Sequence, residues 1–142
     1  MLVDAIKKFS EETNINFNYD YDLKKSNWFN IGGKTKVYFK PDSLSNLIKF
    51  LKIFGTKEKI FTIGAGSNTL INDDTYNGIV IKLGKNFSNT SLLPNGVIVA
   101  GSACKDKKLS EFACDNEMGG LEFLSCIPGT VGGGLRMNAG CF

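Results

Sequence analysis

Residues 60–68 read Ile60-Phe61-Thr62-Ile63-Gly64-Ala65-Gly66-Ser67-Asn68. The apolar first half is typical of a buried strand, and it leads directly into a loop with two glycines. Glycine tolerates positive φ and allows a ligand to approach the backbone, so successive N–H groups in such a loop can form a concave anion site. The spacing alone leaves two interpretations open, which are a phosphate-binding loop and a tight turn without a ligand.

Two better-known phosphate-binding motifs do not fit this loop. The dinucleotide fingerprint needs a third glycine at the position where Thr69 stands. The P-loop needs a Gly-Lys-Ser or Gly-Lys-Thr triplet after its spacer, and no such triplet follows the loop. If the loop binds phosphate, it does so outside these two motifs.

Two further apolar runs, Val37–Phe39 and Ile79–Ile81, flank the loop in sequence. We expect both to share a sheet with residues 60–63, because a short α/β unit must bury its apolar strands. A helix is predicted between the first two strands, with Asp42 or Ser43 as N-cap and its end at Gly55. The dipeptide at 77–78, Asn-Gly, is interpreted as a turn before the third strand.

The remaining chain is interpreted from the same patterns. Residues 2–13 have apolar side chains at helical spacing and predict a short amphipathic helix. Residues 14–22 are interpreted as an irregular arm, and residues 84–95 as a polar connection. A strand is predicted at 97–100, followed by a helix that Leu109, Phe112 and Ala113 mark and that Gly119-Gly120 ends.

A second glycine-rich segment, Ile127-Pro128-Gly129-Thr130-Val131-Gly132-Gly133-Gly134, lies near the end of the chain. Four glycines and a proline in eight residues are costly in backbone entropy and are hard to explain as the interior of a helix or strand. They are expected where backbone lies flat against a planar or phosphorylated ligand. A flexible linker is the alternative, although such linkers are Gly- and Ser-rich and do not carry Ile, Pro and Val.

Composition excludes several classes of function. The chain has 142 residues, of which 42% are hydrophobic, so it can bury a core. The net charge of +3 is small, and 16 of the 17 basic residues are lysines, so no nucleic-acid partner is expected. The absence of histidine excludes histidine catalysis, and the four cysteines have no CxxC spacing, so no metal site is expected. No signal peptide or membrane span is predicted, and the protein is expected to be cytoplasmic with free thiols.

An ordered set of motifs resembles one family. The motifs are WFNIGG at 28–33, GAGSN at 64–68, Gly101, GLEFL at 120–124, IPGTVGG at 127–133 and MNAG at 137–140. Together they resemble UDP-N-acetylenolpyruvoylglucosamine reductase, also called UDP-N-acetylmuramate dehydrogenase, of bacterial peptidoglycan synthesis. The resemblance implies an α+β FAD-binding fold of the vanillyl-alcohol oxidase and p-cresol methylhydroxylase type, with two α+β subdomains.

The resemblance also implies a division of the chain. An N-terminal helix and arm would span residues 1–26, and the first FAD-binding subdomain residues 27–92. Residues 93–142 would be the start of the second subdomain, which is expected to be incomplete.

The resemblance implies which residues bind FAD. The backbone N–H groups of the first loop would hold the pyrophosphate, the second loop would lie along the flavin and pyrophosphate, and the MNAG motif would lie near the isoalloxazine. The implied residues are Gly64, Ala65, Gly66, Ser67, Asn68, Thr69, Gly101, Ile127, Pro128, Gly129, Thr130, Gly132, Gly133, Asn138 and Gly140. Glu122 and Phe123 are expected to orient the second loop rather than to contact the cofactor.

In the family, NADPH reduces the flavin, and the reduced flavin transfers a hydride to the enolpyruvyl group of UDP-N-acetylglucosamine enolpyruvate. The family's catalytic Ser, Arg and Glu lie after the MNAG motif, so no catalytic residue and no metal ligand is expected here. The chain is therefore expected to be the N-terminal part of the enzyme, inactive alone, and no protein partner is implied. Two alternatives remain, which are another flavin oxidoreductase of the same fold and a non-catalytic nucleotide-binding module.

Overall fold

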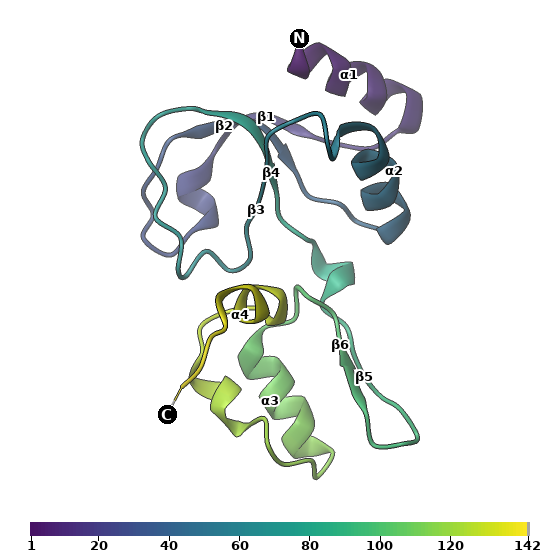
Figure 1. Cartoon of the computed structure of the whole chain (residues 1–142), viewed down its shortest axis with the longest axis vertical. Helices are drawn as coiled ribbons and strands as arrows, with labels where there is room; N and C mark the ends of the chain where they lie inside the picture. Colours follow the sequence, from purple (N-terminus) through teal and green to yellow (C-terminus); the bar gives the residue numbers. More distant parts are fainter. Residues whose placement is uncertain (142) are drawn as a thin grey trace. The chain divides into compact units, whose positions relative to one another are not determined.

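A computed structural model describes residues 1–141 of the chain, which form two compact units, Met1–Leu83 and residues 84–141 (Figure 1). The first unit contains α1 (Leu2–Thr13), β1 (Asn18–Asp22), η1 (Leu23–Ser26), β2 (Lys34–Phe39), α2 (Leu44–Phe54), β3 (Ile60–Thr62) and β4 (Tyr76–Ile81). The second contains η2 (Lys85–Phe87), β5 (Thr90–Leu92), β6 (Ile98–Ala100), α3 (Asp106–Asp115), η3 (Glu122–Cys126) and α4 (Val131–Met137). Elements labelled η are 3₁₀ helices.

The first unit is built on a four-stranded sheet with the strand order β1-β2-β4-β3. Strand β4 pairs in parallel with both β2 and β3, with Val37 opposite Ile79 and Ile60 opposite the same Ile79. The three strands predicted from the apolar runs therefore share one sheet, as expected. Helix α2 begins at Ser43, whose hydroxyl accepts a hydrogen bond from the Asn46 N–H at 3.2 Å.

The core of this unit lies between the sheet and the two helices, which cover the same face of it (Figure 1). Phe9 of α1 and Phe50 and Phe54 of α2 pack against alternate residues of β2 and β4. The rings of Phe39 and Phe50 have centroids 4.6 Å apart. Because side chains alternate across a strand, the neighbours of these residues face the opposite side of the sheet, where a second apolar cluster forms. That second face carries the candidate site.

Two sequence-based interpretations of this unit are wrong. Residues 18–22 are not irregular but form β1, an antiparallel edge strand on β2, where the ring of Tyr21 stacks on Tyr38 with centroids 4.0 Å apart. Pairing and stacking outweigh the low strand propensity of Asn and Asp. Residues 77–78 are not a turn but belong to β4, where the Gly78 carbonyl accepts a hydrogen bond from the buried Thr35 hydroxyl at 3.1 Å. A Cβ at Gly78 would lie 2.6 Å from the Lys59 carbonyl oxygen, so glycine is needed for packing.

The second unit begins inside the segment that was predicted to be a polar connection. Residues 84–95 instead hold η2 and β5, which pairs with β6 as an antiparallel hairpin. Helix α3 ends at Asp115, a few residues before the predicted glycine pair. Within residues 1–141, no helix is long and apolar enough to cross a bilayer.

The glycine run near the C-terminus is helical, which contradicts the prediction made from its entropy cost. Helix α4 contains Gly132, Gly133 and Gly134, and the hydroxyl of its N-cap Thr130 accepts a hydrogen bond from the Gly133 N–H. A Cβ on Gly132 would lie only 2.9 Å from the Cβ of Ser102. Close packing of α4 on the segment before α3 therefore outweighs the poor helix propensity of glycine.

Candidate functional site

The loop that follows β3 has free backbone donors. The Ile63 N–H donates to the Ile81 carbonyl at 2.9 Å, and this is the last ladder bond before the loop. Among the described residues, the N–H groups of residues 64–68 donate to no acceptor. Unsatisfied N–H groups in succession are the feature that lets a loop bind an anion. Of the two interpretations that the sequence left open, the geometry favours a phosphate-binding loop.

Gly66 fixes the shape of this loop. Its φ is +74°, and a Cβ there would clash with the Ser26 carbonyl oxygen and lie 2.7 Å from the Cα of Asn27. The Gly66 carbonyl also accepts a hydrogen bond from the Trp28 N–H at 3.1 Å. The loop is therefore held against the segment that begins the WFNIGG motif, which explains why the two motifs occur together in this chain.

Asn27 secures that neighbouring segment. Its side-chain amide donates to the carbonyls of Leu23 and Ile31, at 2.9 Å and 2.8 Å. Its Oδ1 is buried and has no partner among residues 1–141. A ligand at this place could donate a hydrogen bond to Asn27 Oδ1 and accept hydrogen bonds from the free N–H groups of the loop.

Lys82 places a positive charge close to the loop. Its Nζ donates to the Ser26 carbonyl oxygen at 3.3 Å, and this is the same oxygen that packs against Gly66. Burial, and secondarily the charge of Lys40, lower the pKa of Lys82. An anion bound at the loop would oppose both effects, because an opposite charge stabilises the ammonium form.

The sequence analysis did not single out Lys82. One signal could have found it, since Lys82 directly follows β4 and the loop directly follows β3. The carboxyl ends of neighbouring parallel strands meet at one edge of a sheet, where ligands of open α/β sheets bind.

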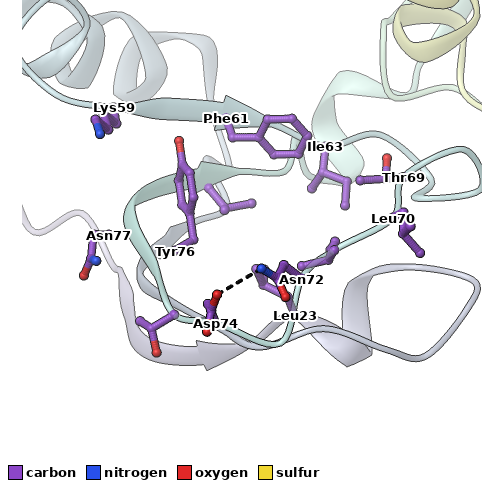
Figure 2. Close-up of a pocket in the computed structure, with 13 residues that line it drawn as sticks. Leu23, Lys59, Phe61, Ile63, Thr69, Leu70, Asn72, Asp74, Tyr76 and Asn77 are labelled. Carbon is purple, nitrogen blue, oxygen red and sulfur yellow. Dashed lines mark hydrogen bonds between the residues drawn. The ribbon is translucent and has the colours of Figure 1, made fainter.

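A pocket of about 450 Å³ lies beside the loop on the second face of the sheet (Figure 2). Ile63 and Thr69, which flank the loop on either side, both line it. The rings of Phe61 on β3 and Tyr76 on β4 line it as well (Figure 2). The remaining lining residues are Leu23, Lys59, Leu70, Ile71, Asn72, Asp74, Thr75, Asn77 and Val80. Of the predicted site residues, only Thr69 faces this pocket.

The second glycine-rich segment differs from the first because its N–H groups are mostly paired. The N–H groups of Val131 and Gly132 donate to the carbonyls of Cys104 and Ser102, both at 2.9 Å. Gly134 donates to the Thr130 carbonyl at 2.7 Å, and Gly129 to the Ile127 carbonyl at 2.9 Å. This segment can present surface to a ligand, but few of its backbone donors remain for a phosphate.

Gly101 and Asn138, two further predicted residues of the second unit, have structural roles. The Gly101 N–H donates to the Asn89 carbonyl at 2.8 Å, and a Cβ at Gly101 would clash with the Phe87 carbonyl. Asn138 has φ +48° and ends α4, and Gly140 and Pro128 are exposed. The Glu122 carboxylate accepts a hydrogen bond from the Gly120 N–H at 2.8 Å, and the backbone N–H groups of Glu122 and Gly120 lower its pKa.

No cluster of His, Cys, Asp or Glu within the described part of the chain could hold a metal ion. The free N–H groups and the adjacent ammonium group instead suit a ligand that contains phosphate.

Residues 35–142 match the FAD binding domain family. The chain is 70% identical over 142 residues to UDP-N-acetylenolpyruvoylglucosamine reductase of Pelagibacter ubique, covering all of this chain and 47% of that protein. The reductase of the same name from Rickettsia akari is 47% identical over 123 residues, which cover 87% of this chain and 41% of the relative. The chain thus spans about half the length of the curated relatives it matches.

A solved structure is also similar. The crystal structure of UDP-N-acetylenolpyruvylglucosamine reductase from Thermus caldophilus superposes with a TM-score of 0.70 at 26% identity, covering 89% of this chain and 42% of that one. These matches confirm the α+β class, the FAD-binding fold and the resemblance that the ordered motifs predicted. The roles of individual residues in cofactor binding stay predictions.

Proposed function

This chain belongs to the FAD-binding domain family, and from that premise we propose that it is the FAD-binding part of a flavin-dependent reductase of peptidoglycan synthesis. The whole enzyme would convert UDP-N-acetylglucosamine enolpyruvate to UDP-N-acetylmuramate with NADPH as the hydride donor. Cell-wall biogenesis, and through it cell shape and division, would be the process served, in the cytoplasm.

One observation carries the proposal, and it is the row of free N–H groups at residues 64–68 in a chain 70% identical to a curated reductase. The FAD pyrophosphate is negatively charged and has oxygens that can accept hydrogen bonds from these N–H groups. Gly66 shapes the row, and Lys82 adds the nearby positive charge.

The chain's own residues would bind and orient the cofactor. The proposal assigns the pyrophosphate to residues 64–69 and the flavin to Gly101, residues 127–133, Asn138 and Gly140. Bound FAD supplies the hydride transfer chemistry, and the protein determines where the cofactor lies. The roles in the second unit rest on the resemblance, because its backbone donors are largely paired within the chain.

Titration of the purified chain with FAD tests this proposal. We expect a shifted flavin absorption band and a saturable change in flavin fluorescence as FAD leaves water for the protein. A titration with ADP should show competition, because the pyrophosphate loop would hold both molecules. A flavin spectrum that stays that of free FAD at all protein concentrations would contradict the proposal, whereas ADP binding without FAD binding would favour a non-catalytic nucleotide-binding module.

We predict that Lys82→Met weakens FAD binding. The substitution removes a half-buried positive charge beside the loop while keeping a long apolar side chain, so affinity should fall about tenfold, or about 1.4 kcal/mol. The loss should shrink at high salt, because part of the attraction is screened. Dissociation constants from fluorescence titration at two salt concentrations measure both effects.

Lys36→Met is the matched control. Lys36 is an exposed lysine on β2, so its removal lowers the net charge equally without changing the loop. Equal affinities of the two variants would show that only net charge matters and that Lys82 does not act at the site.

A further inference from the structure

The second unit contains a buried carboxyl group that no partner satisfies. Asp106 is the first residue of α3 and is 1% exposed. Its Oδ2 accepts no hydrogen bond among the described residues. Buried polar side-chain atoms normally have a partner, so an unpartnered carboxyl oxygen calls for a specific explanation.

This carboxyl group lies directly behind the second glycine-rich segment. The Asp106 N–H donates to the Gly129 carbonyl at 3.3 Å, and Lys105 and Thr130 form an antiparallel bridge. A Cβ on Gly129 would lie 2.5 Å from Asp106 Oδ2, and one on Gly134 would lie 3.6 Å from Oδ1. The carboxyl group therefore fills the space that a side chain at Gly129 would need, whereas a Cβ on Gly134 would only make an ordinary contact with it.

We propose that Asp106 is a positioning residue for the cofactor, whose buried carboxyl group holds the turn at Gly129 in the conformation that binds FAD. This inference rests on the proposed function, because it assumes that residues 127–133 lie against the flavin. It assigns to Asp106 no contact with FAD, and the effect passes through Gly129.

The surroundings of the group favour its uncharged form. Burial raises the pKa of Asp106, since a charged oxygen that accepts no hydrogen bond is costly away from water. The N-terminus of α3 favours the ionised form, but this effect is smaller than the cost of burying such a charge.

The neighbouring charged groups do not change this conclusion. The Cys104 thiol is buried, and Lys108 and Asp106 shift its pKa in opposite directions, second to burial, which raises it. Lys105 and Lys108 on the α3 side are exposed, as are Glu122 of η3 and Arg136 of α4. Burial is the cause of the raised pKa of Asp106.

A pH series of FAD titrations tests the proposal with Asp106→Asn and Asp106→Ala. Asn keeps the shape and stays uncharged, so its affinity should match that of the unchanged chain within about twofold at the acidic end of the series, where the carboxyl group is protonated. The affinity of the unchanged chain should fall about tenfold as the pH rises and the carboxyl group ionises, whereas the affinity of the Asn variant should not change. The Ala variant should bind weakly at every pH.

Asp115→Asn is the control, because Asp115 is an exposed carboxylate on the same helix and should leave the pH profile unchanged. Thermal unfolding without FAD gives a second measurement. Because the folded-state pKa of Asp106 is raised, its stabilising contribution is present below the ordinary carboxyl pKa and is lost as the pH rises through the raised one. The Asn variant should lack this loss.

A double-mutant cycle tests the contact itself. Gly129→Ala should weaken FAD binding more in the unchanged chain than in the Asp106→Ala variant, where the clash with Oδ2 is absent. Equal effects in both backgrounds, or an Asn variant with the pH profile of the unchanged chain, would overturn the role of Asp106. If the unchanged chain binds no FAD, the proposed function fails as well, and this outcome is distinct from the other two.

Discussion

The 142-residue chain, saturated with FAD, is expected to give no NADPH oxidation that depends on UDP-N-acetylglucosamine enolpyruvate. The resemblance places the proton-donating Ser and the assisting Arg and Glu after the MNAG motif at 137–140. The chain spans 47% of the reductase of Pelagibacter ubique, so much of that protein has no counterpart here. Protonation of carbon and stabilisation of enolate charge each contribute large factors to such a rate, so their loss should leave turnover at the blank.

The full-length reductase of Pelagibacter ubique is the control, and it should turn over in the same assay. Absorbance of NADPH, followed with and without the enolpyruvyl substrate, separates substrate-dependent turnover from slow oxidation by free flavin. Turnover above the blank would mean that a proton donor lies within this chain. Ser67, Ser102 and Ser125 would then be the first residues to replace.

Gly66→Ala is expected to abolish FAD binding and to destabilise the first unit. Alanine would have to adopt φ +74°, which L-residues rarely do. Its Cβ would clash with the Ser26 carbonyl oxygen and would also push Asn27 away from the loop. The positive φ alone costs about 1 kcal/mol, and displacing packed backbone adds on the order of 1–3 kcal/mol. Distortion of the N–H row should lower FAD affinity by about a hundredfold or more.

Gly96→Ala is the matched control for this variant. Gly96 lies in the turn of the β5–β6 hairpin with φ +73°, and a Cβ there would meet nothing within 4 Å. The Gly96→Ala variant has the same cost of a positive φ as Gly66→Ala, but it lacks the clash and lies outside the loop at residues 64–68. Urea unfolding and FAD titration of both variants separate the contributions, and similar losses in the two would mean that φ strain alone explains Gly66.

The ordered motifs were enough to identify the family, and the apolar runs at 37–39, 60–63 and 79–81 were enough to predict three strands that share a sheet. Both signals are local, since a buried strand needs a continuous apolar run and a ligand loop needs glycines at set positions. The helix start at Asp42 or Ser43 was predicted for the same reason, because an N-cap bonds within its own turn, and Ser43 is the residue that does so.

Where a residue depends on distant partners, the sequence alone was misleading or silent. Residues 18–22 are a strand only because β2 pairs with them and Tyr38 stacks on Tyr21. Gly132 stands in α4 because Ser102 approaches too closely for a side chain at this position. In both cases, tertiary packing outweighs a local propensity worth at most about 1 kcal/mol per residue.

The candidate site likewise combines features that the sequence showed with features that depend on the fold. The sequence identified the loop at 64–68 as a candidate, but whether its N–H groups are free depends on which acceptors the fold brings near them. The positions of Lys82 beside that loop and of Asp106 behind Gly129 were equally beyond local patterns. Charge and burial act through space, so only the tertiary structure decided which ionisable groups lie against the two glycine-rich segments.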